Sequence, residues 1–378
     1  MTARKIYYIS GTRADFGLMR ATLEAMRDTA DLEIAVIVTG MHLSPKYGET
    51  VVEIEDARLP IKARIAVDLE EATGATMARN MGTMLSGFAS VLEADRPDVL
   101  LLLGDRGEML AGALAAIHLN IPIVHIHGGE RSGTVDEPVR HAISKLAHFH
   151  FTATEDARER LIRMGESSSH IYVTGAPGID GLVRLAEESR DDLCAKFGFE
   201  PSKALALFIY HPVLQESAST GQEVGEILDF FAKSEIQVVA LMPNSDAGSD
   251  AICAQMQKRV SNKFICLRTH LDRRSFASLM ASADVMVGNS SAGIIEAASF
   301  GIPVVNIGTR QNLRQRNKNV RDVPLSLPEI RNAIVEAIKN GPYPRENVYG
   351  EGRAVERIIA LLQKIPLGKA TLMKINAY

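Results

Sequence analysis

Short apolar runs rich in β-branched residues alternate with longer amphipathic stretches, and this alternation occurs twice along the chain. Continuous apolar runs separated by helical segments are typical of parallel strands that are buried on both faces. The pattern therefore predicts an α/β protein with two doubly wound, Rossmann-like domains. The expected strands are 5–10, 32–38, 98–104, 121–127 and 170–175, then 204–212, 236–243, 263–267, 283–289 and 302–308.

The length of 378 residues suits two domains of ordinary size. A segment with Gly and Pro punctuation over 176–202 separates the two series of strands. We expect an N-terminal domain over 1–176, a C-terminal domain over 177–355, and a final helix and tail over 356–378 that packs back on the first domain. Ligands of such sheets bind at the carboxyl ends of the strands, so the cleft between the domains is the expected site.

Composition excludes several classes of protein. Apolar residues make up 46% of the chain, the net charge is −4, and basic residues are scattered, which gives no sign of a nucleic-acid surface. There is no 18-residue apolar span, so no membrane segment is expected. Cys194, Cys253 and Cys266 form no CxxC pair, which argues against a disulfide frame or a thiolate zinc site. We expect a cytoplasmic protein.

The stretch HIHGGERSGTVDEPVRH, residues 125–141, concentrates ionisable groups directly after an expected strand. A metal site would need ligands at helical spacing, such as HExxH, and the stretch lacks that pattern. A solvated loop does not explain why the charges gather where strand ends converge. Acid–base chemistry is the better interpretation, with His127, Glu130 and Asp136 as candidate proton-transfer groups and Arg140 beside them.

Other polar groups follow strands of the first domain. Arg13, in SGTRADFG, opens a helix and suits an anion. His42 follows the second strand on the cleft side and, like Arg140, is a candidate binding residue. Asp105, in LLLGDRGE, is either a helix cap or an active-site carboxylate. A dinucleotide fingerprint GxGxxG is absent from the chain.

In the second domain the residues after strands suit phosphates. Hydroxyl and N–H groups in GNSSAGIIEA lead into a helix and can hold a diphosphate, while Glu296 suits ribose hydroxyls. The residues alone therefore predict a cleft enzyme that binds a phosphorylated nucleotide in its C-terminal half and transfers protons in its N-terminal half. The candidate binding residues of the second domain are His211, Asn289, Ser290, Ser291, Gly293, Glu296, Arg310 and Arg314, with Arg316 nearby.

These motifs together resemble the UDP-N-acetylglucosamine 2-epimerases. The resemblance rests on GTRADFG, TGMHLSPKYGET, GDRGE, HIHGGERSGTVDEPVRHAISKLAH, YHPV and GNSSAGIIEA, followed by GIPVVNIGTRQ, and it covers nearly the whole chain in order. The GTRAD start and the GGE-SGT-DE block are similar to the hydrolysing branch, which serves the synthesis of sialic-acid-type sugars. The non-hydrolysing branch typically carries GTRPE and an HVEAGLR-like segment, which this chain lacks.

The resemblance implies a GT-B fold, no metal, no cofactor, and a homo-oligomer, either a dimer or a tetramer. It implies that UDP-N-acetylglucosamine and water become N-acetylmannosamine and UDP. UDP is eliminated to give a 2-acetamidoglucal, which is then rehydrated with inversion at C2. Arg13, His211, Ser290, Ser291 and Arg310 match family positions around the UDP phosphates, Glu296 matches the ribose position, and Asp105 and Asp136 match catalytic carboxylates. Because His127 stands where many relatives have Glu, the remaining proton role falls to His127 or to Glu130.

Several alternatives stay open at this stage. The same motifs suit a hydrolysing 2-epimerase of UDP-2,4-diacetamido-2,4,6-trideoxyglucose, on the route to legionaminic acid, and a GDP-linked sugar is a weaker alternative. A retaining glycosyltransferase shares the fold but has less need of proton transfer at C2. An inactive UDP-sugar-binding regulator would not need Asp105 and Asp136. The amphipathic helix expected over 75–94 is either core or an oligomer face.

Overall fold

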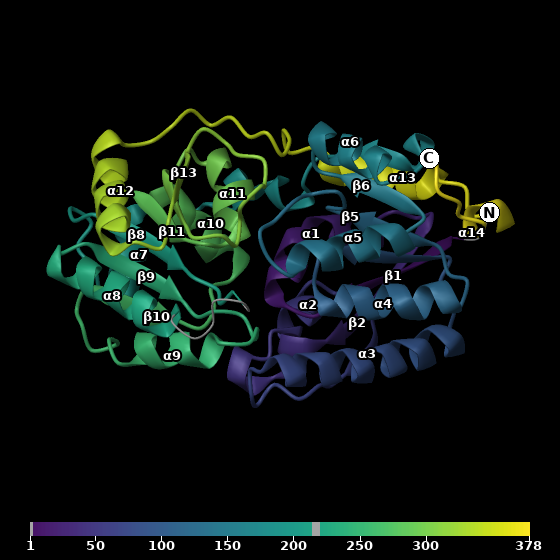
Figure 1. Cartoon of the computed structure of the whole chain (residues 1–378), viewed down its shortest axis with the longest axis horizontal. Helices are drawn as coiled ribbons and strands as arrows, with labels where there is room; N and C mark the ends of the chain where they lie inside the picture. The colour runs from purple at the N-terminus through teal and green to yellow at the C-terminus, as the bar shows by residue number, and fades with distance from the viewer. Residues whose placement is uncertain (1–2, 214–219) are drawn as a thin grey trace.

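The computed structural model describes residues 3–213 and 220–378 of the chain. Its strands form a seven-stranded and a six-stranded sheet, and all neighbouring strands of both sheets run parallel. Helices pack on both faces of each sheet (Figure 1). The prediction of two doubly wound α/β domains is confirmed.

The first sheet has the strand order β3-β2-β1-β4-β5-β6-β7. Its centre is strongly apolar, and every residue of the VLLLL strand β4 is buried. The strands are β1 (Arg4–Ser10), β2 (Leu32–Thr39), β3 (Ile61–Ile65), β4 (Val99–Leu103), β5 (Ile123–Ile126), β6 (Phe149–Thr152) and β7 (Ile171–Val173). The helices around it are α1 (Arg13–Arg27), α2 (Val51–Asp56), α3 (Gly74–Ala94), α4 (Gly107–His118), α5 (Asp136–Leu146) and α6 (Glu155–Arg163).

The second sheet has the strand order β10-β9-β8-β11-β12-β13. Its strands are β8 (Leu205–Ile209), β9 (Gln237–Leu241), β10 (Ile265–Arg268), β11 (Val285–Gly288), β12 (Val304–Ile307) and β13 (Val320–Val323). The helices are α7 (Arg190–Phe197), α8 (Thr220–Lys233), α9 (Ser249–Gln257), α10 (Arg273–Ser282), α11 (Ser291–Ile295) and α12 (Leu327–Asn340).

After α12 the chain returns to the first domain (Figure 1). There α13 (Ala354–Lys364) lies against α1, and its side chains Ile358 and Leu362 are fully buried in the core of the first sheet. The last helix, α14 (Lys369–Leu372), leads into the C-terminal residues on the same side of the molecule (Figure 1). The first domain is therefore built from both ends of the chain.

All ten expected strands are present, and α3 confirms the helix expected over 75–94. One face of α3 packs into the core through Met84, Phe88 and Leu92. The structure adds β3, β6 and β13, which the sequence pattern did not identify. Two of them are edge strands in which charged residues interrupt the apolar run, and β6 is only four residues long and contains a buried His150. Over the described residues, no helix combines the length and the apolar character that crossing a membrane requires.

Candidate functional site

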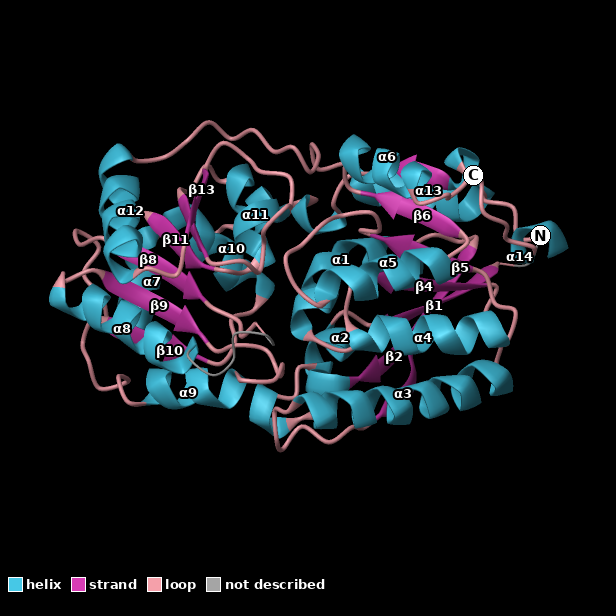
Figure 2. Ribbon diagram, viewed as in Figure 1, coloured by secondary structure: helices cyan, strands magenta, loops and turns pink. Residues whose placement is uncertain are grey.

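The strand order of each sheet reverses beside its first strand, between β1 and β4 in one and between β8 and β11 in the other. Ligands of doubly wound sheets bind at these reversal points. The loops there carry Arg13 and Asp105 in the first domain, and His211 and Asn289 in the second. The arrowheads of the two sheets point toward each other, so the four loops meet between the domains (Figure 2).

A chain of ion pairs crosses from one domain to the other. The Asp105 carboxylate pairs with Arg140 of α5, and its Oδ2 lies 3.6 Å from Nη2 of Arg314. Arg314 also pairs with Glu130, which pairs in turn with Nδ1 of His127. Burial alone would raise the pKa of Glu130, but its pairing with His127 and Arg314 outweighs burial and holds that pKa below its usual value. The buried charges therefore compensate one another.

The loop after β5 is held in an unusual conformation. His127 has a φ of 63°, in the left-handed region that residues other than glycine seldom adopt. Arg140 braces this loop by donating to the Glu130 carbonyl at 3.2 Å and to Ser132 Oγ at 3.3 Å. Among the described residues, His127 Nε2 is buried without a hydrogen-bond partner. Glu130 thus pairs with Nδ1 of the His127 ring, and Nε2 is available for a further hydrogen bond or a proton transfer.

Between the domains lies a cavity of about 280 Å³. Its lining includes Asp105 and Asp136 from the first domain and Arg310 from the second, and Arg310 Nη2 lies 3.7 Å from Asp136 Oδ2. His127 and Glu130 lie outside this lining. Of the four predicted catalytic residues, the two aspartates therefore face the cavity, while His127 and Glu130 connect to it through Arg314.

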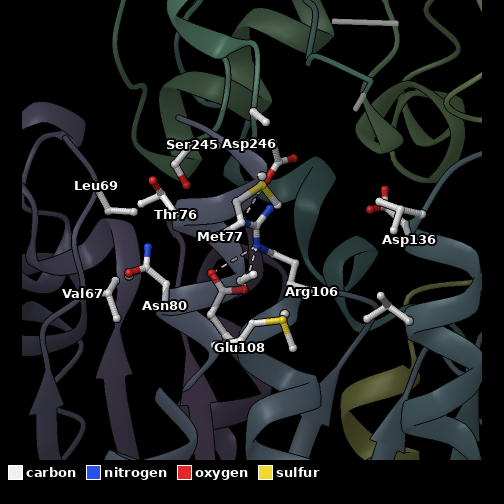
Figure 3. Close-up of a pocket in the computed structure, with 18 of the residues that line it drawn as sticks. Val67, Leu69, Thr76, Met77, Asn80, Arg106, Glu108, Asp136, Ser245 and Asp246 are labelled. Carbon is white, nitrogen blue, oxygen red and sulfur yellow. Dashed lines mark hydrogen bonds and ion pairs between the residues drawn. The ribbon is translucent and has the colours of Figure 1, made fainter. Parts of the chain in front are cut away.

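Arg106, Glu108 and Asp246 also line this cavity and were not among the predicted site residues (Figure 3). Arg106 Nε lies 3.3 Å from Glu108, and its Nη2 lies 3.4 Å from Asp246 of the opposite domain. Burial would lower the pKa of Arg106, but the carboxylates of Glu108 and Asp246 outweigh it and raise that pKa. The motif GDRGE contains two of these residues, whereas Asp246 has no motif that could have identified it.

Part of the cavity lining is apolar. The neighbouring amide of Asn80 is occupied elsewhere, because it donates from Nδ2 to the Asp68 carbonyl at 2.6 Å and accepts from the Asp68 N–H at 3.2 Å. We call this part of the lining the apolar wall; it consists of Val67, Leu69, Met77, Met81, Met84, Val135 and Val139, of which Figure 3 labels the first three.

A second cavity, of about 150 Å³, gathers five of the predicted binding residues: Arg13, His211, Ser290, Ser291 and Glu296. Burial lowers the pKa of Arg13 to about 10, which leaves it charged at neutral pH. A guanidinium, two hydroxyls and an imidazole in one place are donors suited to a phosphate or diphosphate.

His211 is fixed by the loop after β11. Its N–H donates to Asn289 Oδ1 at 2.7 Å, Asn289 Nδ2 donates back to the His211 carbonyl at 2.8 Å, and the Asn244 N–H donates to His211 Nδ1 at 3.2 Å. Burial, with the charges of Arg310 and other arginines, holds the pKa of His211 well below its usual value. A neutral ring that accepts at Nδ1 carries its proton on Nε2, so His211 is a hydrogen-bond donor at that atom.

Glu296 has a partner that the sequence analysis did not identify. Arg273, in the first turn of α10, pairs with Glu296 and donates to the Gly178 carbonyl at 2.6 Å. Both residues line the second cavity. Arg273 therefore fixes the carboxylate at the rim of this cavity, where it was expected to bind ribose hydroxyls.

The remaining predicted binding residues lie behind the two cavities. Buried His42 bonds Ser10 Oγ at 2.9 Å and Thr50 Oγ1 at 2.8 Å, and burial lowers its pKa. Gly293 lies in α11 and packs against Val304 of β12. The predicted binding residues outside the lining of both cavities are His42, Arg140, Asn289, Gly293 and Arg314. Arg140 and Arg314 pair with Asp105, and Asn289 bonds to His211, so these three hold residues that do line a cavity.

The described residues hold no group of three or more His, Cys, Asp or Glu side chains arranged to bind a metal ion. The three cysteines are free thiols, and Cys194 and Cys266 are buried. Neither cavity is lined by a cysteine.

The sequence of this chain matches a known protein family. The family described as "UDP-N-acetylglucosamine 2-epimerase" matches residues 24–363. A Legionella pneumophila protein named UDP-N,N'-diacetylbacillosamine 2-epimerase (hydrolyzing) is 48% identical over 375 residues, which cover 99% of this chain and 100% of the relative. A Neisseria meningitidis UDP-N-acetylglucosamine 2-epimerase is 33% identical over 349 residues, covering 92% of this chain and 91% of the relative.

The fold has solved counterparts. A crystal structure of UDP-GlcNAc 2-epimerase from Neisseria meningitidis bound to UDP-GlcNAc superposes with a TM-score of 0.79 at 21% identity, covering 95% of this chain and 99% of that one. At this level of identity the match shows the fold alone, and it supports the GT-B-like arrangement of two parallel-sheet domains.

The ion pair between Glu130 and Arg314 predicts a large loss of stability when one partner is removed. Arg314→Met should lower the free energy of unfolding by about 3–5 kcal/mol, because it leaves a buried carboxylate without its guanidinium. Adding Glu130→Gln to this variant should recover part of the loss. Urea denaturation of both single variants and the double variant measures the coupling.

Arg353→Met is the matched control, since Arg353 pairs with Glu356 at the exposed start of α13. It should leave the free energy of unfolding nearly unchanged. Equal effects of Arg314→Met and Arg353→Met, or strict additivity with Glu130→Gln, would show that the pair does not join the domains.

Proposed function

This chain belongs to the UDP-N-acetylglucosamine 2-epimerase family, and on that basis we propose that it is a hydrolysing 2-epimerase of a UDP-sugar. The observation that carries the proposal is the pairing of two unlike cavities between the domains. One holds donors suited to a diphosphate, and the other holds two aspartates beside an apolar wall.

The proposed reaction eliminates UDP and then adds water. A base removes the proton at C2 of the sugar, the C2–H electrons form a C1=C2 double bond, and the C1–O bond breaks to release UDP. Water then adds its oxygen to C1, and a proton is delivered to C2 from the opposite face. The products are UDP and the free sugar with inverted configuration at C2.

Inversion at C2 requires two proton-transfer groups, one on each face of the sugar. Asp105 is held by two guanidinium groups, those of Arg140 and Arg314, and we assign it to orienting them at the cavity. Asp136 lines the same cavity with a single contact of 3.7 Å to Arg310, which supports its assignment to one transfer. We assign the other transfer to His127 acting through one intervening water, since it lies outside the cavity lining, its ring is oriented by Glu130, and Nε2 has no hydrogen-bond partner among the described residues.

Positive charge on the C-terminal side supports departure of the diphosphate. Arg13, His211, Ser290 and Ser291 line the second cavity. Arg310 lines the larger cavity, where it pairs with Asp136 and donates to the Asn289 carbonyl at 3.2 Å. Donors that are already in place stabilise charge that develops on a leaving group. Glu296, fixed by Arg273, is assigned to the ribose hydroxyls.

For the sugar, we propose a 2,4-diacetamido-2,4,6-trideoxyhexose, as in the name of the 48% identical Legionella pneumophila relative. The apolar wall supports this choice, since a C6 methyl and acetamido methyl groups gain from burial against Met77, Met81 and Leu69. The C4 and C6 hydroxyls of N-acetylglucosamine would lose hydrogen bonds to water against the same wall.

UDP-N-acetylglucosamine, which the motifs suggested first, is the second candidate. The Neisseria meningitidis relative named for that substrate, at 33% identity, supports it. An apolar pocket discriminates weakly against a hydroxyl, by about a hundredfold, so slow turnover of this sugar is compatible with the first candidate.

The test is a proton NMR time course with each UDP-sugar in D₂O. We expect UDP and the free manno-configured diacetamido sugar, deuterated at C2, at a kcat/KM at least about tenfold above that for UDP-N-acetylglucosamine. A reversed preference would assign UDP-N-acetylglucosamine as the substrate. Release of UDP only when an acceptor sugar is added would replace the epimerase with a glycosyltransferase.

Asp136→Asn should lower kcat by about 10²–10⁴-fold, because the amide cannot transfer the proton at C2. UDP should still bind with nearly the affinity of the wild type, which calorimetry measures. Glu93→Gln, an exposed carboxylate near the end of α3, is the control and should have no effect on either quantity. Loss of UDP binding in Asp136→Asn would show that this carboxylate is structural.

Met77→Gln should lower kcat/KM for the diacetamido substrate by about tenfold, because it replaces part of the apolar wall by an amide of similar size. Turnover of UDP-N-acetylglucosamine should fall less or rise. Met373→Gln, at a methionine that is 77% exposed, controls for the substitution itself. An equal fall in kcat/KM for both substrates would show that the apolar wall does not determine the choice of sugar.

A further inference from the structure

The last residues of the chain close the carboxyl end of α5. The ammonium group of Lys374 donates to the carbonyls of Ser144, Lys145 and Ala147 at 3.2, 2.8 and 2.6 Å, and it lies 2.6 Å from Oε2 of Glu166. The last carbonyls of a helix have no partner within the helix, and a cation there also complements the helix dipole. Lys374 therefore acts as a cap supplied from 227 or more residues away in sequence.

Further bonds fix the tail on the same surface. The Ala377 N–H donates to the Gly165 carbonyl at 2.8 Å, and Lys145 Nζ donates to Asn376 Oδ1 at 2.6 Å. Glu166, the centre of this cluster, is 2% exposed and pairs with Lys145 at 2.6 Å as well as with Lys374. Burial would raise the pKa of Glu166, but its hydrogen bonds to His150 and the two lysines lower it to about 2.

The other end of α5 is the proton-transfer side of the cleft. Its first residue is Asp136, which lines the larger cavity, and one turn later Arg140 pairs with Asp105. An 11-residue helix spans roughly 16 Å and behaves as a rigid rod. A shift at its carboxyl end is therefore carried to both aspartates.

We propose that residues 374–377 of the C-terminal tail form a positioning clasp for the reaction, and that Lys374 is a positioning residue which acts through α5 on Asp136 and Arg140. The inference rests on the proposed function for its kinetic consequence, and on the contacts of Lys374 for its structural one. The tail reaches neither cavity. It affects turnover by fixing the helix, with no contact to substrate.

The test compares Lys374→Met with Lys369→Met, an exposed lysine on the same tail, in the full-length protein. In Lys374→Met, kcat should fall about tenfold or more, since small displacements of catalytic groups are costly. KM and the affinity for UDP should stay within twofold of the wild type. Lys374→Arg, which keeps the charge and the donors, should restore most of the lost kcat.

Hydrogen exchange supplies a readout that does not depend on activity. Amides over 134–141 should exchange faster in Lys374→Met than in Lys369→Met, although the site of substitution lies at the other end of the helix. If Lys374→Met fails to fold, Asn376→Ala removes one bond of the clasp and should give a smaller change in the same direction.

The outcomes separate the two proposals. Wild-type protein that turns over neither UDP-sugar overturns the proposed function, whereas hydrogen exchange still tests the clasp. Active wild-type protein with equal kcat in Lys374→Met and Lys369→Met overturns the clasp alone. A lower melting temperature with unchanged kcat and unchanged exchange over 134–141 would reduce the tail to a stabilising role and also overturn it.

Discussion

Paired opposite charges across the cleft are the constraint on which the rest of the site depends. Arg310 and Arg314 of the second domain meet Asp136, Glu130 and Asp105 of the first. A buried charge without a partner is strongly unfavourable, so each domain needs the other to satisfy its polar groups. The pairs thereby fix how the two sheets face each other, and with that the position of both cavities.

The same arrangement separates two chemically different groups of side chains. Cationic and hydroxyl groups gather where β8 and β11 end, and carboxylates gather where β4 and β5 end. Gly288, the last residue of β11, is required at this point. Its φ of 134° is one that residues with a side chain rarely adopt, and an added Cβ would overlap the Ile209 carbonyl. The smaller cavity is thus built mainly from fixed polar donors, while the larger cavity combines charged groups with an apolar wall.

Packing also links distant parts of the chain to this site. Helix α13 completes the core of the first domain, and the residues after it hold α5 at the end remote from the cavity. The helix that begins at Asp136 is consequently supported at one end by ion pairs of the cleft and at the other by the C-terminus. Both supports come from residues after 300, so the first domain depends on contacts with residues distant in the sequence.

Much of this could be predicted from the sequence, because local patterns carry the information. Apolar runs of β-branched residues mark buried parallel strands, and polar motifs directly after them mark the strand ends, which is why Asp105, Asp136, Arg13, His211 and Ser290 could be selected as candidates. The edge strands β3 and β13 could not be predicted in this way, since charged residues interrupt their apolar runs.

Contacts between residues far apart in the chain leave no such pattern. Asp246 reaches Arg106, Arg273 reaches Glu296, and Lys374 reaches α5 only through the folded backbone. The sequence by itself determined the two α/β domains and the chemical groups at their strand ends, because periodicity and strand-end polarity are local properties. Only the tertiary structure decided which of those groups face a cavity, which hold others in place from behind, and that the larger cavity is lined in part by apolar side chains, because these depend on long-range packing and on the pairing of buried charges.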